Sequence, residues 1–132
     1  MGIALLLIAR LAARLITPHA AWFAVFACLS LRGVNDQAAD ARPYALGTCL
    51  AAASLLFLIR WLDSAHWWDA ALFIIFAAML WRVHLLFWPF YIVLALYALM
   101  RLLRHETRNG WFPTLVMFAL LGFALILSLI HI

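Results

Sequence analysis

An arginine and a histidine stand two residues apart inside the apolar stretch FIIFAAMLWRVHLLFWPFYIVLALYALM, residues 73–100. An ionisable side chain at membrane depth is by default a candidate for function, because its charge is costly to place in hydrocarbon. The Arg82 guanidinium could bind a lipid phosphate, a substrate anion or a quinone oxygen. Its structural alternatives are to reach the head groups or to bond to the carbonyls of a neighbouring helix.

The histidine of this pair, His84, could ligate haem or bind a quinone, or it could be a packed and hydrogen-bonded side chain. On a helix it would lie beside Trp81 and Trp88, which would supply aromatic walls for a ligand. Haem ligated by two histidines needs a second histidine at matching depth on another helix, and only His19 is suitably placed. Haem is therefore the minor interpretation, and we predict no cofactor.

Two further arginines, Arg10 and Arg14, lie one helical turn apart in MGIALLLIARLAARLI and would share one helix face. Together with Arg82 they could hold the phosphate of a phospholipid or a polyprenyl phosphate, because guanidinium groups bond phosphate oxygens strongly. Aromatic side chains would then contact the hydrocarbon part of that ligand.

A second polar group lies in RWLDSAHWWD, which contains Arg60, Asp63, His66 and Asp69. Pairs within residues 60–63 and 66–69 would close a loop between two helices, whereas two carboxylates and a histidine could also do acid–base chemistry. The spacing matches no metal-ligand or nucleophile motif, and the sequence contains no G-x-S-x-G, H-E-x-x-H or P-loop pattern. We therefore favour a structural role, predict neither catalytic residues nor a metal site, and do not expect an enzyme.

The composition indicates the environment in which these residues must be positioned. The 132 residues are 70% hydrophobic and 11% charged, and the mean hydropathy is +1.11. A soluble domain is about half apolar and a quarter charged. Because a chain this short cannot bury so much apolar surface in its own core, residues 1–132 are expected to form a single integral membrane domain.

All nine basic residues are arginines, and the formal net charge is +4. The arginines are scattered among apolar segments without a basic patch in polar surroundings, which argues against nucleic-acid binding. The alanine-rich, lysine-free composition is typical of a GC-rich bacterial genome, so we expect the bacterial cytoplasmic (inner) membrane. Cys28 and Cys49 lie in apolar stretches and are expected to act as small buried hydrophobes.

Four apolar segments are candidates for membrane-spanning helices, since about 20 apolar residues cross the hydrocarbon core. Polar breaks with turn formers separate them, and no alternating strand pattern is present. The sequence therefore predicts an all-α transmembrane helical bundle of about four spans. The candidate spans lie within residues 3–31, 44–62, 70–100 and 111–130.

The first segment allows two placements. In one, residues 2–16 form an amphipathic helix in the interface, and Pro18 begins a short span at a position that proline tolerates. In the other, residues 3–31 form one long tilted helix that is kinked near Pro18. We favour the interfacial helix because an arginine at membrane depth costs at least about 2.5 kcal/mol on insertion scales.

The third segment is long for a single span. A helix over residues 70–100 would measure about 46 Å, whereas the hydrocarbon core is about 30 Å thick. We expect one continuous helix, tilted and bent near Pro89. The alternative, a tight hairpin at residues 82–84, is rejected because residues 70–81 are too few to span and no Gly, Asn or Asp supplies a turn.

Arginine counts give an expected orientation, since cytoplasmic loops carry the excess of basic residues. With four spans, residues 32–43 and 101–110 share one side and contain five arginines. Both termini and the RWLDSAHWWD loop would lie on the opposite, non-cytoplasmic side. Arg10 and Arg14 in an interfacial helix conflict with this orientation.

The expected function is that of a small, non-catalytic accessory or structural subunit that packs against a larger membrane complex. The small size and short loops motivate this expectation. Membrane lipids are expected partners, together with other membrane subunits or further copies of the chain. The alternatives are binding or transport of an amphipathic anion at Arg82, and electron transfer through haem or a quinone at His84.

Overall fold

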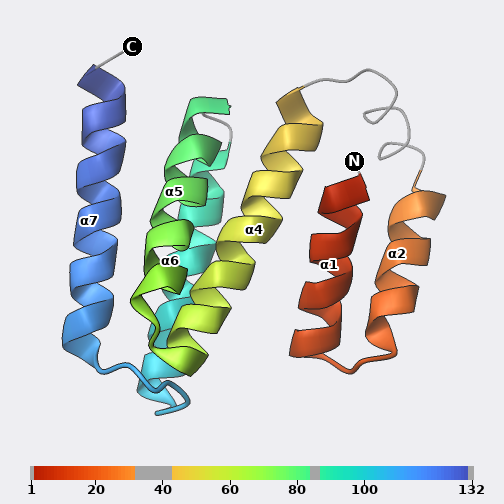
Figure 1. Ribbon diagram of the computed structural model, residues 1–132, viewed down its shortest axis with the longest axis horizontal. Helices are drawn as coiled ribbons and strands as arrows, with labels where there is room; N and C mark the ends of the chain where they lie inside the picture. Colours follow the sequence, from red (N-terminus) through yellow and green to blue (C-terminus); the bar gives the residue numbers. More distant parts are fainter. Residues whose placement is uncertain (1, 32–42, 84–86, 131–132) are drawn as a thin grey trace.

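The computed structural model describes residues 2–31, 43–83 and 87–130, which contain six α-helices and no strand. The prediction of an all-helical bundle is therefore confirmed. Successive helices run in alternating directions (Figure 1). The helices are α1 (Gly2–Leu15), α2 (Ala20–Ser30), α4 (Pro43–Ser64), α5 (Trp67–Val83), α6 (Trp88–Leu103) and α7 (Trp111–Ile130).

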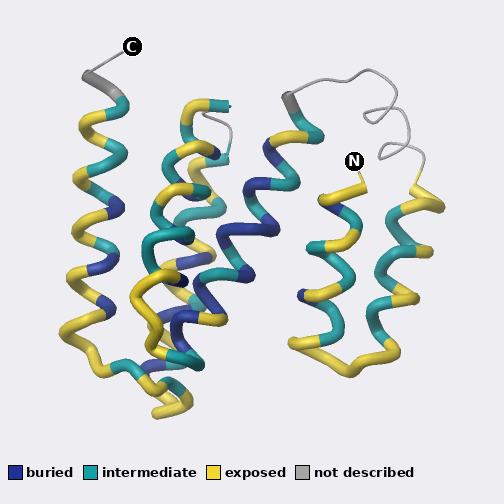
Figure 2. The backbone as a smooth tube through the Cα atoms, viewed as in Figure 1, coloured by how far each residue is buried: buried dark blue, intermediate teal, exposed yellow. Residues whose placement is uncertain are grey.

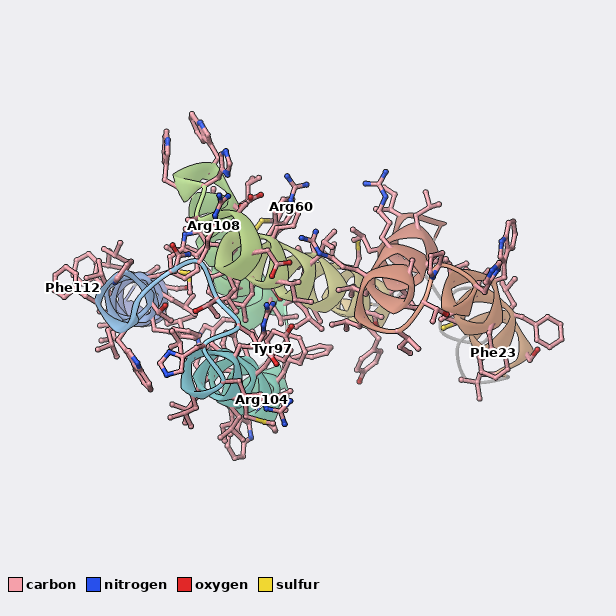
Figure 3. The ribbon with its side chains drawn as sticks, turned by 90° about the horizontal axis from the view of Figure 1, so that it is seen from below. Phe23, Arg60, Tyr97, Arg104, Arg108 and Phe112 are labelled. Carbon is pink, nitrogen blue, oxygen red and sulfur yellow. The ribbon has the colours of Figure 1, made fainter. Side chains whose placement is uncertain are left out.

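The long helix α4 lies at the centre of an elongated molecule. It packs against α1 on one side and against α5 and α6 on the other, while α2 packs on α1 and α7 packs on α5. Seen from below, the row is narrow, with Phe23 of α2 at one tip and Phe112 of α7 at the other (Figure 3). The two outer helices are therefore covered on one side only.

The main core lies where α4, α5, α6 and α7 meet, and the buried face of α4 forms much of it (Figure 2). Its fully buried side chains include Leu58, Leu62, Phe73 and Leu94. A smaller cluster joins α1 to α4 through Leu11 and aliphatic residues of α4. The α1–α2 pair is thus attached to the bundle mainly through α1.

The number of helices long and apolar enough to cross a membrane is smaller than predicted. Two helices meet this condition, Tyr44–Ser64 and Trp111–Ser128, instead of the four expected. The remaining described helices α1, α2, α5 and α6 have 14, 11, 17 and 16 residues. At 1.5 Å per residue these are about 16 to 26 Å long, short of a hydrocarbon core of about 30 Å.

The expectation of one continuous helix over residues 70–100 is wrong. The chain reverses direction between Val83 and Phe87, so that α5 and α6 form a hairpin (Figure 1). The Tyr91 hydroxyl of α6 donates a hydrogen bond to the Ala77 carbonyl of α5 at 2.6 Å. The proline expected to bend a helix instead lies in the first turn of α6, where its missing N–H costs nothing.

The N-terminal segment is also divided differently from either expected placement. A long helix over residues 3–31 is excluded, because α1 ends at Leu15 and α2 begins at Ala20. The bounds of α1 match the expected helix over residues 2–16. However, α2 has only 11 residues and cannot form the span expected after Pro18.

Three connections lie at one end of the molecule, which we call the polar end. They join α1 to α2, α4 to α5, and α6 to α7 (Figure 1). The Arg108 amide donates to the Leu62 carbonyl at 3.0 Å, which fixes residues 101–110 beside the end of α4. Residues 101–110 were expected to share one side with residues 32–43, of which 32–42 lie outside the described residues. Helix α4, which begins at Pro43, starts at the end opposite residues 101–110 (Figure 1), because the chain makes an additional reversal between α5 and α6.

Candidate functional site

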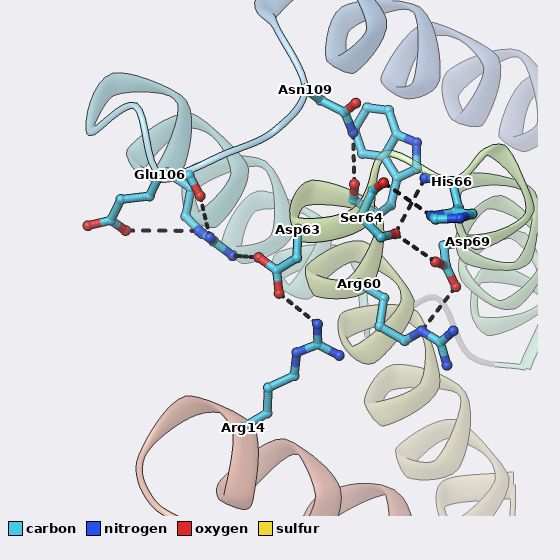
Figure 4. A network of polar contacts seen from close by, with 10 residues as sticks. Arg14, Arg60, Asp63, Ser64, His66, Asp69, Glu106 and Asn109 are labelled. Atoms are coloured by element: carbon cyan, nitrogen blue, oxygen red, sulfur yellow. Dashed lines mark hydrogen bonds and ion pairs between the residues drawn. The ribbon is translucent and has the colours of Figure 1, made fainter.

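Asp63, in the last turn of α4, connects three helices at the polar end (Figure 4). Its Oδ2 accepts a hydrogen bond from Nη2 of Arg14 on α1, and its Oδ1 accepts one from Nη1 of Arg101 on α6, both at 2.7 Å. Their side chains are between 18% and 39% exposed, so water screens these ion pairs only in part. One carboxylate therefore fixes α1 and α6 relative to α4.

The chain leaving α6 folds back onto the same arginine. His105 adopts a left-handed conformation with φ 53°, and the Glu106 amide donates to the Arg101 carbonyl at 3.0 Å. This is the Schellman arrangement that ends many helices. It brings the Glu106 carbonyl within hydrogen-bonding reach of Arg101 Nη2 and the Glu106 carboxylate to 3.9 Å from Arg101 Nε.

A second branch of polar contacts surrounds Asp69, in the first turn of α5. Its carboxylate is buried, lies 3.1 Å from Arg60 Nε and accepts a hydrogen bond from the Ser64 hydroxyl at 3.0 Å. A negative charge there also interacts favourably with the N-terminal end of the helix dipole. His66 Nδ1 lies 3.1 Å from the Ser64 carbonyl, within the turn between α4 and α5. These contacts close the α4–α5 turn.

The end of α4 is capped by the segment before α7. The Asn109 side-chain amide donates to the Trp61 carbonyl at 2.8 Å, and the Arg108 amide donates to the Leu62 carbonyl. Ala65 follows the helix with φ 59°. Carbonyls in the last turn of a helix lack intrahelical donors, so the Arg108 amide satisfies the Leu62 carbonyl, while the Trp61 carbonyl accepts from Asn109 and also from the Ala65 amide at 2.9 Å.

Two pockets adjoin this network. The first, of about 340 Å³, lies between α1, α4 and α6, and the second, of about 480 Å³, lies at the α4–α5 turn; Arg14 lines both. The first pocket places guanidinium groups beside Leu15, Ile59 and Met100, which suits a phosphate or carboxylate that carries a hydrocarbon part. The polar side chains of the first pocket are Arg14, Asp63, Tyr97, Arg101, Arg104 and Glu106; those of the second are Arg14, Arg60, Ser64, His66, Trp68 and Asp69.

The structure brings the predicted loop residues Arg60, Asp63, His66 and Asp69 to the same end, but with different pairings. The expected hydrogen-bond pair within residues 66–69 is present, since the Asp69 amide donates to the His66 carbonyl at 3.0 Å. The expected pair within residues 60–63 is replaced by Arg60–Asp69 and by the long-range pairs of Asp63. Arg101 and Glu106 were not predicted as members. No sequence signal identifies them, because Arg101 lies 38 residues from Asp63. The described residues contain no group of side chains that could hold a metal ion.

The ligand site predicted around Arg82 is not assembled as expected. Arg82 is exposed in the last turn of α5, at the end of the molecule opposite Arg14, and α5 is about 25 Å long. It lines a pocket of about 430 Å³ between α5 and α7, together with Met79 and Ser128. Arg10 is exposed on α1. The three arginines are therefore not brought together.

The aromatic residues predicted around the histidine lie on both sides of the α5–α6 reversal. His84 itself lies outside the described residues. The Trp81 ring meets the Tyr91 ring edge-on, with centroids 5.9 Å apart, and its indole N–H is buried without a hydrogen-bond partner among the described residues. Trp88 is 57% exposed at the start of α6. Both tryptophans contribute to the helical hairpin or to its surface.

No protein-family model, curated protein or solved structure matches this chain. Any assignment of function therefore rests on the contacts, exposure and charges of its own residues.

Proposed function

We propose that this protein is a small integral membrane protein without catalytic activity, and that it packs against a larger membrane protein through α2. One observation carries the proposal: α2 contains no charged residue and buries no side chain. Trp22, Phe23 and Phe26 on this helix are 80%, 76% and 70% exposed. Aromatic side chains presented in this way are typical of surfaces that bind another protein or contact lipid.

The exposure of α7 supports a lipid environment. Its apolar window is 17% buried, compared with 56% for the central helix α4. A bilayer would cover such an uncharged surface, and α4 and α7 have lengths of about 30 Å or more, which match the hydrocarbon core. We therefore propose that α4 and α7 cross the membrane with the shorter helices packed alongside.

The short length of α2 favours a protein partner over lipid alone. The α1–α2 pair starts at the polar end, where Arg14 contacts Asp63, and α2 is about 16 Å long. It stops short of the level at which α4 begins (Figure 1). A helix of this length does not cross the hydrocarbon core by itself. A partner chain over α2 would cover its exposed aromatic side chains.

The distribution of arginines supports an orientation with the polar end in the cytoplasm. Five of the nine arginines belong to that end, and Arg82 is the arginine that the described residues place at the other. Basic residues accumulate on the cytoplasmic side. We propose the bacterial cytoplasmic membrane as the location. The five arginines are Arg14, Arg60, Arg101, Arg104 and Arg108.

Site-specific photo-crosslinking in the native membrane tests the partner. A photoreactive phenylalanine analogue at Phe23 should give a discrete adduct with a second protein, because α2 would be covered by it. The matched control is Phe112 of α7, which is 79% exposed and, like Phe23, lies in the first turn of its helix. Phe112 lies at the end of the row of helices opposite Phe23 (Figure 3). It should give lipid adducts.

Two results would contradict the proposal. One is lipid adducts alone from Phe23; the other is the same protein adducts from Phe23 and from Phe112, which would indicate unspecific collision. Mass spectrometry of the adducts distinguishes a different protein from a second copy of this chain. A protein adduct confined to Phe23 would support a partner at α2.

A further inference from the structure

The first pocket at the polar end has an excess of positive charge. Its lining contains the guanidinium groups of Arg14, Arg101 and Arg104, and the carboxylates of Asp63 and Glu106. Three positive and two negative groups leave one positive charge over. Because the internal ion pairs use both carboxylates, the surplus charge is available to an anion from outside the chain.

Arg104 supplies this surplus charge. Asp63 already accepts from Arg14 and Arg101, and Glu106 lies against Arg101. The exposed side chain of Arg104 has no ion pair or hydrogen bond with any residue that the structure describes. A guanidinium group offers five N–H donors and forms paired hydrogen bonds with phosphate oxygens. Arg104 directly follows α6 at the polar end and lines the same pocket as the ion-paired residues (Figure 3 labels its side chain).

The rest of the pocket is suited to an amphipathic ligand. Leu15, Ile59 and Met100 form its apolar wall, and the Tyr97 hydroxyl adds a further hydrogen-bonding group. The volume of about 340 Å³ lies within the range of small-molecule sites. In the membrane placement proposed above, the polar end lies at head-group level, where lipid phosphates are found.

We propose that this pocket, between α1, α4 and α6, binds the phosphate group of an anionic phospholipid, with Arg104 as the main ligand and Arg14 as the second. The site depends on the proposed membrane placement and does not depend on a partner at α2. An internal ion-pair network accounts for the bridge at Asp63, but it leaves the third arginine of the lining without a role.

Lipid titration of the purified full-length protein in neutral detergent, followed by native mass spectrometry, tests the site. The probes are phosphatidylglycerol and phosphatidylcholine. Arg104→Gln should weaken phosphatidylglycerol binding about five-fold relative to the matched control Arg108→Gln, beyond any general loss of charge. Arg108 is an exposed arginine at the same end that does not line the pocket. Equal weakening in both variants, or none in Arg104→Gln, would overturn the proposal.

A second variant changes the charge in the opposite direction without touching the Asp63 bridge. Glu106→Gln raises the excess in the pocket from one positive charge to two, and the Glu106 side chain is 54% exposed. Phosphatidylglycerol should then bind about five-fold more tightly. A network with a purely structural role would give unchanged or weaker binding, and either result would count against the site.

The same experiment separates a lipid phosphate from a soluble one. Excess inorganic phosphate should leave phosphatidylglycerol bound if the acyl chains contribute through Leu15, Ile59 and Met100. Displacement by inorganic phosphate that depends on Arg104 would support the phosphate site but assign it to a soluble anion. Phe23 does not line this pocket. A negative result for lipid binding would therefore not affect the crosslinking test of a partner at α2.

Discussion

At Asp63, one carboxylate accepts hydrogen bonds from arginines that lie 49 and 38 residues away in the sequence. Neither arginine comes from the loop to which Asp63 belongs. The sequence identifies Asp63 as a member of a polar cluster, but a single sequence does not show which cations it meets, because helix packing brings them together. Local pairing was therefore the wrong expectation for Asp63, whereas Asp69 does pair within the loop, with His66 and Arg60.

Replacement of Asp63 by Asn should lower the free energy of unfolding by about 1 kcal/mol, a value kept small because water partly screens the ion pairs. Two guanidinium groups lose their shared counter-ion while the shape of the side chain is kept. Thermal unfolding in detergent measures the effect. Glu106→Gln, which removes only a 3.9 Å contact, is the control and should cost less. Equal losses would show that Asp63 has no special role.

The two residues with left-handed backbone should tolerate glycine. Ala65 and His105 have φ values of 59° and 53° at the ends of α4 and α6. Because a Cβ atom is unfavourable in this conformation, Ala65→Gly and His105→Gly should each stabilise the protein by up to about 1 kcal/mol. Ala51→Gly, in the middle of α4, should destabilise it by a similar amount. The unfolding temperatures of the three variants, compared with that of the unsubstituted protein, measure these effects. A loss of stability in all three variants would refute the prediction.

At the scale of elements, continuous apolar runs were predicted well and interrupted ones were not. The segment 44–62 became α4, and 111–130 became α7 with the predicted bounds. The hairpin of α5 and α6 was missed because residues 82–87 contain no turn former. At the start of α6 the Phe87 ring packs directly against Gly47 of α4. A Cβ atom added to Gly47 would lie 2.5 Å from that ring, so this close contact requires glycine. Such tertiary contacts cannot be read from periodicity.

The hairpin can be tested by labelling. Trp68 at the start of α5 and Leu103 at the end of α6 are both exposed at the polar end. In a background with Cys28 and Cys49 replaced by alanine, Trp68→Cys and Leu103→Cys should react with a membrane-impermeant maleimide from the same side. Labelling of the two cysteines from opposite sides of the membrane would instead indicate one continuous helix across it.

At the scale of the whole molecule, the same variants report the orientation. The polar end carries five arginines, so Trp68→Cys should be protected in intact cells and labelled in inverted membrane vesicles. Leu46→Cys near the start of α4, which is 51% exposed and lies at the other end of a helix proposed to cross the membrane, is the control and should show less protection in cells. Labelling of Trp68→Cys in intact cells would contradict the proposed orientation and would indicate that the polar end faces away from the cytoplasm.

The attachment of α2 to the bundle through α1, and of α1 through α4, has a consequence for biosynthesis. Chains leave the ribosome from the N-terminus, so α1 and α2 emerge before the surface of α4 on which α1 packs has been made. Throughout that interval the aromatic face of α2 is as accessible to a neighbouring subunit as it is in the finished protein. The partner proposed at α2 could therefore bind the nascent protein before its own bundle closes.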